Sequence, residues 1–71
     1  MVVSHEGVKD FYKGRLLACL NYGPVSGRGI LGVVRRCMSH DLSEEMLTMD
    51  EYMELNTLSN EIVSALWDME G

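Results

Sequence analysis

The sequence predicts an all-α domain of two or three helices, in which a helical hairpin precedes one long C-terminal helix. Apolar residues recur at three- and four-residue spacing in three stretches of the chain. Of the 71 residues, 46% are hydrophobic and 24% are charged, a balance typical of folded globular proteins. A chain of this length forms one domain at most, so residues 1–71 are read as a single small helical domain. Because a core of this size contributes only about 3–5 kcal/mol net, we expect oligomerisation to complete the fold.

The first expected helix runs from Ser4 to Tyr22. The Ser4 hydroxyl can cap its N-terminus. Gly23 and Pro24 end it, because glycine accepts a left-handed conformation and proline cannot continue the hydrogen-bond ladder. The apolar side chains of this segment fall on one helical face: Val8, Phe11, Tyr12, Leu16, Cys19 and Leu20.

A glycine-rich loop is expected over residues 23–29, followed by a second helix. The apolar residues of this second helix again match the helical spacing: Ile30, Val33, Val34, Cys37 and Met38. An alternative remains open, in which residues 16–22 and 30–34 are two strands of a β-hairpin around the loop. The five consecutive apolar residues 16–20 do not alternate with polar ones, which favours the helix.

Two helix starts follow, each with a capping-box pattern. Asp41 has Glu44 three residues later, and Thr48 has Glu51. The first is expected to open a single turn or to join the second. The second opens a long helix over residues 49–69, about 30 Å long at 1.5 Å per residue.

The long helix carries more apolar surface than one neighbouring helix can cover. Residues Leu55, Leu58, Ile62, Ala65 and Met69 keep the alternating spacing by which helices interdigitate, while Met49, Met53 and Trp67 lie to one side. Either the first two helices bury this surface or a second subunit does, and we favour the second subunit because excess apolar area must be covered. The expected subunit interface consists of Leu55, Leu58, Ile62, Leu66, Trp67 and Met69.

Charge is divided unevenly along the chain. The first 36 residues hold all six cationic side chains and two carboxylates, and the last 35 hold nine carboxylates, which gives formal charges of +4 and −9. Such a division suggests two halves that pair, or a basic half that takes an anion. On the long helix, the recurring carboxylates Asp50, Glu54, Glu61 and Asp68 form either a solvated edge or a row opposite Lys9, Lys13, Arg35 and Arg36.

The segment from Gly27 to Gly32 spells G-x-G-x-x-G, in which glycines let backbone amides approach a phosphate. A helix is expected before it and the chain is too short for a βαβ unit, so a dinucleotide-binding fold is excluded. A plain turn explains the pattern without a ligand, while Arg28 and the nearby arginines favour an anion or nucleotide pocket. The candidate ligand-binding residues are Tyr12, Lys13, Ser26, Gly27, Arg28, Gly29, Arg35 and Arg36.

Residues suited to catalysis or metal binding are sparse, so we expect neither an enzyme nor a bound cofactor or metal. Cys37-x-x-His40 supplies only half of a zinc site, and His5 and Cys19 are the only residues that could complete it. Two cysteines are more typical of reduced thiols in a cytosolic protein than of a disulfide framework, although a bridge between them remains open.

The sequence therefore predicts a small binding protein that sequesters, inhibits or recruits a partner protein through an oligomeric helical surface. Met46, Met49 and Met53 provide adaptable apolar contacts suited to such a partner. The alternative is an anion or nucleotide sponge that uses the glycine-rich segment. A pI near 4.7 argues against nucleic acid as a partner. No apolar run is long enough to span a bilayer or resembles a signal peptide, so we expect a cytoplasmic location.

Overall fold

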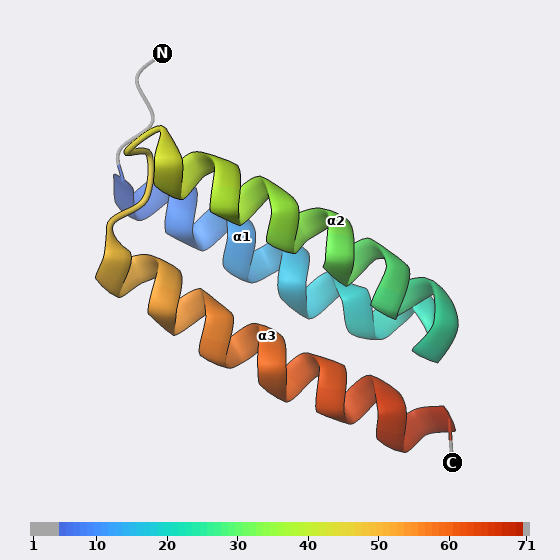
Figure 1. Cartoon of the computed structure of the whole chain (residues 1–71). Helices are drawn as coiled ribbons and strands as arrows, with labels where there is room; N and C mark the ends of the chain where they lie inside the picture. The colour runs from blue at the N-terminus through green and yellow to red at the C-terminus, as the bar shows by residue number, and fades with distance from the viewer. Residues whose placement is uncertain (1–4, 71) are drawn as a thin grey trace.

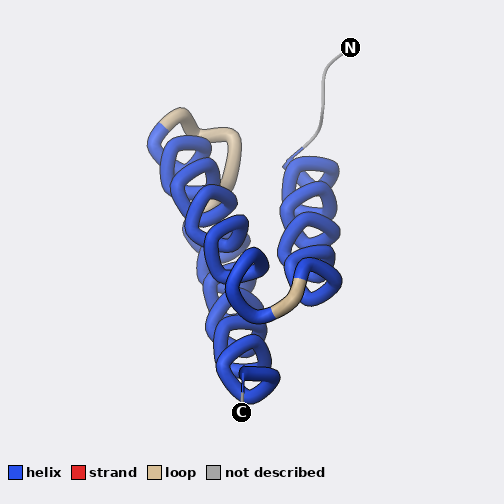
Figure 2. The backbone as a smooth tube through the Cα atoms, turned by 90° about the vertical axis from the view of Figure 1, so that its right-hand side faces the viewer, coloured by secondary structure: helices blue, strands red, loops and turns tan. Residues whose placement is uncertain are grey.

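The computed structural model describes the backbone of residues 5–70 and the side chains of residues 7–70, which form three helices. Helix α1 (His5–Ala18) continues into a short 3-10 helix, η1 (Cys19–Tyr22), and is followed by α2 (Pro24–Ser43) and α3 (Met49–Glu70). Successive helices run antiparallel, so α1 and α3 are parallel to each other, and all three lie side by side (Figures 1 and 2). The bundle measures 41 × 22 × 16 Å along its principal axes.

The predicted all-α fold is confirmed, and the β-hairpin alternative is wrong. Residues 16–22 belong to the end of α1 and to η1, and residues 30–34 lie within α2. The predicted long helix over residues 49–69 is confirmed with one further residue at its C-terminus. The proposed cap at Ser4 lies outside the described residues.

The loop predicted for residues 23–29 is wrong, because α2 already begins at Pro24. Gly23 alone makes the corner: its φ of 85° is a left-handed conformation that glycine adopts without steric cost. Proline fits the first helical position, where its missing amide hydrogen is not needed. The Gly27 amide then donates to the Gly23 carbonyl, at 2.8 Å, and closes the first turn.

The capping-box patterns on either side of the connection between α2 and α3 have different outcomes. The predicted capping box at Thr48 is confirmed: the Thr48 amide donates to Glu51 Oε1 at 3.0 Å, and the Glu51 amide donates to Thr48 Oγ1 at 3.2 Å. The capping box predicted at Asp41 is wrong. Asp41 lies inside α2, where its carboxylate accepts a hydrogen bond from the Tyr12 hydroxyl of α1.

The core runs along the common axis of the three helices. Its buried apolar residues are Val8, Tyr12, Leu16, Cys19, Leu31, Val34, Met38, Leu47, Leu55, Ile62 and Leu66. Ser59 is also fully buried, and its hydroxyl has no hydrogen-bond partner within the described structure. At Gly27 the backbone of α2 passes so close to η1 that an added Cβ would lie 2.5 Å from the Cys19 carbonyl oxygen. Glycine therefore serves close packing there.

Candidate functional site

The residues predicted to hold an anion do not converge on one pocket. Tyr12 is buried in α1 and donates its hydroxyl hydrogen to Asp41, on the α2 side. Lys13 lines a hollow between α1 and α3 together with Glu54. Ser26 and Gly29 are exposed helical residues of α2, and Gly27 is buried. Since these residues lie within helices, the backbone cradle expected from the glycine pattern is not present.

Among the cationic residues predicted to bind an anion, Arg28 makes the closest contacts with other side chains. Its Nη1 donates to Glu70 Oε2 at 2.7 Å, and its guanidinium carbon lies 3.7 Å from the centroid of the Trp67 ring. Stacking on an aromatic ring and pairing with a carboxylate are both favourable for arginine. These contacts tie the start of α2 to the last turn of α3. Further along α2, Arg35 Nη2 lies 3.5 Å from Asn56 Oδ1 of α3, and Arg36 is exposed.

The predicted subunit interface is divided by the structure into a buried part and an exposed part. The chain already buries Leu55, Ile62 and Leu66 in its own core, so the prediction that these three face a second subunit is wrong. Leu58 is half-buried beside the core. Trp67 and Met69 stay exposed, and their role in an interface remains a prediction. The intrachain alternative is therefore correct for the central seam of α3.

Large apolar side chains are exposed at several places on the described surface, and we name one of these surfaces the α1–α2 groove. It runs between these helices and is lined by Phe11, Tyr12, Arg15, Ile30, Val33, Val34 and Cys37. Phe11 and Val33 are 55% and 59% exposed. The groove continues past Phe11 toward Val8 and Met46, where a second hollow adjoins it. Arg15 lies beside the groove with its guanidinium carbon 5.1 Å from the Phe11 ring centroid.

Sequence periodicity placed Phe11 in the core, together with Tyr12. Only Tyr12 is buried, and the two rings meet edge to face with centroids 5.5 Å apart. Neighbouring helical residues point about 100° apart, so two adjacent aromatic side chains cannot both lie at the centre of a narrow buried face. That spacing was the available signal that one of them belongs to a surface.

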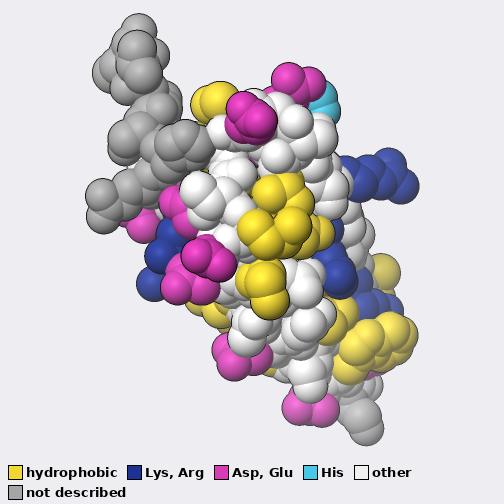
Figure 3. Space-filling model, turned by 60° about the vertical axis from the view of Figure 1, so that its left-hand side comes forward, with side chains coloured by type: hydrophobic (Ala, Val, Ile, Leu, Met, Phe, Trp, Pro, Cys, Tyr) yellow, Lys and Arg dark blue, Asp and Glu magenta, His cyan; other side chains and the backbone are white. Residues whose placement is uncertain are grey.

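A second exposed apolar surface is the α2–α3 face, defined by Met49, Met53 and Trp67 of α3 and the neighbouring edge of α2. Met49, Met53 and Trp67 are 59%, 61% and 57% exposed. Tyr52 is half-buried at the same edge, with its hydroxyl 3.3 Å from Ser39 Oγ of α2. Figure 3 shows hydrophobic side chains in the middle of one side of the molecule, with basic side chains to the right, acidic side chains above and below, and both kinds together to the left.

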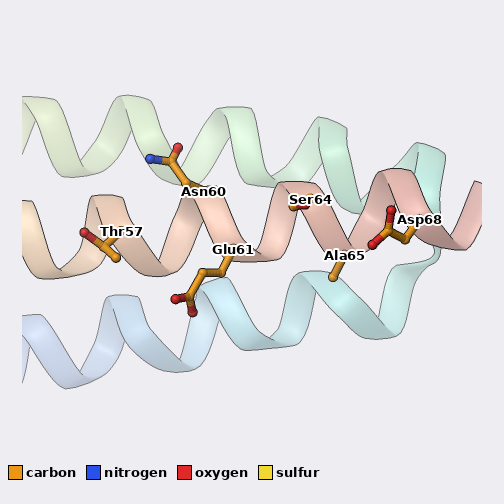
Figure 4. A pocket seen from close by; sticks show the side chains of 6 residues that line it. All are labelled: Thr57, Asn60, Glu61, Ser64, Ala65 and Asp68. Carbon is orange, nitrogen blue, oxygen red and sulfur yellow. The ribbon is translucent and has the colours of Figure 1, made fainter.

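The acidic row of α3 is partly paired and partly solvated. Lys9 Nζ of α1 lies 2.5 Å from Glu54 Oε2, and this contact raises the pKa of Lys9. Glu61 and Asp68 border a shallow hollow on the outer surface of α3, whose floor is made by small side chains (Figure 4). Asp50 is exposed as well. The two halves of the chain thus pair at Lys9 with Glu54 and at Arg28 with Glu70, and the remaining row faces solvent.

The two cysteines lie apart in the structure, one in the core and one at the surface. Cys19 and Cys37 are both free, so the bridge considered from the sequence is not formed. Burial raises the pKa of the Cys19 thiol, whereas Cys37 is exposed at the α1–α2 groove. Among the described residues, no group of three His, Cys, Asp or Glu side chains is placed to hold a metal ion. No described helix has the length and hydropathy to cross a bilayer.

Comparison of the chain with protein-family models, with curated proteins and with solved structures found no match. The features of the chain that bear on function are the α1–α2 groove, the α2–α3 face and the charges beside them.

Proposed function

We propose that this chain is a non-enzymatic binding protein that self-associates and uses its helical surface to sequester, inhibit or recruit a partner protein. The observation that supports the proposal is that large apolar side chains remain exposed to solvent although the chain already buries a complete core. In addition to the buried core, Phe11, Val33, Met53 and Trp67 are each more than half exposed. Contiguous exposed apolar surface is typical of interaction sites.

The α1–α2 groove is the surface that we assign to the partner protein. Two packed helices leave a furrow between them that accepts the apolar stripe of a third helix, as α3 shows on the other side of the same pair. Phe11, Ile30 and Val33 supply the apolar walls. Arg15 beside Phe11 would favour a partner with a carboxylate at the edge of its apolar stripe.

The proposal is tested by capture of the partner from a native cytoplasm with the tagged full chain. Val33→Asp places a charge in the groove, and Leu17→Asp, on the exposed side of α1, is the matched control. We expect the same protein to be retained by the wild type and by Leu17→Asp, and to be lost with Val33→Asp while circular dichroism shows an unchanged helix content. If the wild type retains no protein, or if Val33→Asp retains the same protein equally well, the assignment of the α1–α2 groove to a partner protein is contradicted.

The second candidate function, binding of an anion or a nucleotide, is supported by the exposed Trp67 ring beside Arg28, where a base could stack near a phosphate. The ligand would have to replace the Glu70 carboxylate at Arg28. Titration calorimetry with mono-, di- and cyclic nucleotides distinguishes this candidate. Heat that is absent in Arg28→Ala would favour it, and no heat from any nucleotide would end it.

A further inference from the structure

The α2–α3 face is organised as a stripe along α3. The residues Met49, Met53, Asn56, Asn60, Val63 and Trp67 are separated alternately by four and three positions. This is the spacing of a helix–helix seam, and it is a different seam from the one that the chain buries in its own core. The stripe is apolar at its two ends and carries the amides of Asn56 and Asn60 in its middle.

The stripe has charges of opposite sign on its two sides. On the α2 side lie Arg28, which pairs with Glu70, and Arg35, which contacts Asn56. On the other side, Asp50, Glu61 and Asp68 follow the outer surface of α3, about 60–120° around the helix from the stripe. Figure 3 shows hydrophobic side chains in the middle of one side of the molecule and basic side chains on the right; on the left, acidic side chains lie together with further basic ones.

We propose that this face binds a second copy of the chain in a two-fold dimer whose axis runs parallel to the helices. A two-fold axis in this direction places the basic side of one copy against the acidic side of the other. A two-fold axis across the helices would instead bring arginines against arginines and carboxylates against carboxylates, which opposes association. The inference rests on the self-association in the proposed function, and adds the face and the direction of the dimer.

The positions of the charges along the helices fit this arrangement. Arg28 contacts Trp67 and Glu70, so its position along the helix axis is that of the last turns of α3. Asp68 lies at the same position along the axis, on the other side of the stripe. Arg35 contacts Asn56, whose height lies between those of Asp50 and Glu61. Rotation about an axis parallel to the helices leaves each residue at the same position along that axis. Arg28 of one copy therefore faces Asp68 of the other, and Arg35 of one copy lies between Asp50 and Glu61 of the other.

The two asparagines support the same direction. In a dimer with this axis, Asn60 of one copy faces Asn60 of the other, and an amide can both donate and accept a hydrogen bond. A polar asparagine in an otherwise apolar seam is known to fix the register and the number of strands. Asn60 is exposed in the single chain, so its amide is open to this pairing, whereas the Asn56 amide oxygen already accepts from Arg35.

The face is tested by light scattering on the full chain and on two aspartate variants. Met53→Asp lies in the stripe, and Leu17→Asp, on α1 away from the stripe, is the matched control. We expect the wild type and Leu17→Asp to have twice the mass of 8.0 kDa, and Met53→Asp to dimerise at least tenfold more weakly with unchanged helix content. A dimeric Met53→Asp would overturn this face while leaving self-association intact. A monomeric wild type at high concentration would overturn self-association itself.

The direction is tested separately by a spin label on Met49→Cys in a Cys37→Ser background. In the proposed dimer the two labels lie across the axis from each other, so their distance is short. In the antiparallel arrangement they are separated along the helices by roughly 27 Å, from 1.5 Å per residue over α3. A long distance would overturn the parallel direction.

As an independent readout, Arg35→Glu should weaken the dimer and Glu61→Arg should restore it. No restoration would count against the proposed charge contacts.

Discussion

At Gly27 the backbone of α2 touches η1, and a single added carbon would change the packing of the domain. The Cβ of an alanine would lie 2.5 Å from the Cys19 carbonyl oxygen and 2.9 Å from a Leu66 methyl carbon. The carbonyl belongs to the backbone and cannot move away cheaply. The same residue type two positions later, Gly29, has open space around its Cβ position.

We therefore predict opposite effects of alanine at these two glycines. Gly27→Ala should lower the free energy of unfolding by about 1–3 kcal/mol because the backbones of α2 and η1 must separate. Gly29→Ala should raise it by about 0.5–1 kcal/mol, because alanine is the better helix former at an open position. Urea unfolding of both variants measures the difference. If Gly27→Ala is as stable as the wild type, the close contact is not a constraint.

The buried phenol of Tyr12 makes the stability of the domain depend on alkaline pH. Burial is the main cause that raises its pKa, and the hydrogen bond to the Asp41 carboxylate adds to it. The unfolded chain can lose this proton above the usual tyrosine pKa of about 10, whereas the folded chain holds it. Stability from Tyr12 is thus fully present below pH ~10 and is lost as the pH rises further.

We predict that the free energy of unfolding falls above pH ~10 and that Tyr12→Phe loses part of this dependence. Because the contact with Glu54 also raises the pKa of Lys9, the comparison must be made between the two proteins at each pH. Ultraviolet absorbance gives a second readout, in which one of the three tyrosines ionises only with unfolding. Parallel pH profiles of the wild type and Tyr12→Phe would refute the role of Tyr12.

At the scale of the helices, α3 owes its sharp start to the reciprocal hydrogen bonds of Thr48 and Glu51. Removing the threonine hydroxyl leaves the Glu51 amide without its side-chain acceptor. We predict that Thr48→Ala lowers the free energy of unfolding by about 0.5–2 kcal/mol. Thr57→Ala is the matched control within α3, since the Thr57 hydroxyl bonds only the Met53 carbonyl one turn back. Equal effects of the two variants would show that the cap adds nothing.

The helices that could be predicted from the sequence are those whose signals are local. The apolar spacing of residues 49–69 and the pattern Thr48-x-x-Glu51 depend on neighbours within one or two turns, and both are found in the structure. Asp41 shows the limit of such signals. Its pattern also resembles a helix start, but its partner is Tyr12, 29 residues earlier, and no local pattern records that contact.

The start of α2 and the candidate site were not predictable for a related reason. Glycine permits a flexible turn and also close approach of two backbones, and the sequence between Gly23 and Gly29 does not tell these uses apart. Likewise, the seam through Leu55 and Ile62 has the same spacing whether it packs on its own chain or on another. Only the placement of α1 and α2 shows that the chain itself covers it.

At the scale of the whole molecule, the basic first half and the acidic second half form ion pairs with each other and also leave charged edges on the surface. Within the part of the chain that the structure describes, ion pairs of Lys9 with Glu54 and of Arg28 with Glu70 join the halves. Ion pairs at the surface contribute little to stability, so they do not hold the bundle together. The charged edges beside the α2–α3 face would act between molecules when a second copy approaches.

We predict that the dimer weakens when salt is added, because screening shortens the range of attraction between the edges. Between low salt and roughly 0.5 M sodium chloride the dissociation constant should rise several-fold, while the helix content stays the same. Analytical ultracentrifugation at a series of salt concentrations measures this. A dissociation constant that is unchanged, or that falls with salt, would mean that apolar contacts alone join the two copies.

The connection between α2 and α3 has a consequence for proteolysis. Residues 44–48 lie between the two helices, Glu44 and Glu45 are exposed, and Glu45 has a φ of 63°, which is a strained conformation for a residue with a side chain. Cleavage by a glutamate-specific protease is expected there first. The nicked halves would remain bound, because α3 still fills the furrow between α1 and α2 with Leu55, Ile62 and Leu66. The domain is therefore suited to division into two complementary fragments that reassemble when they are brought together.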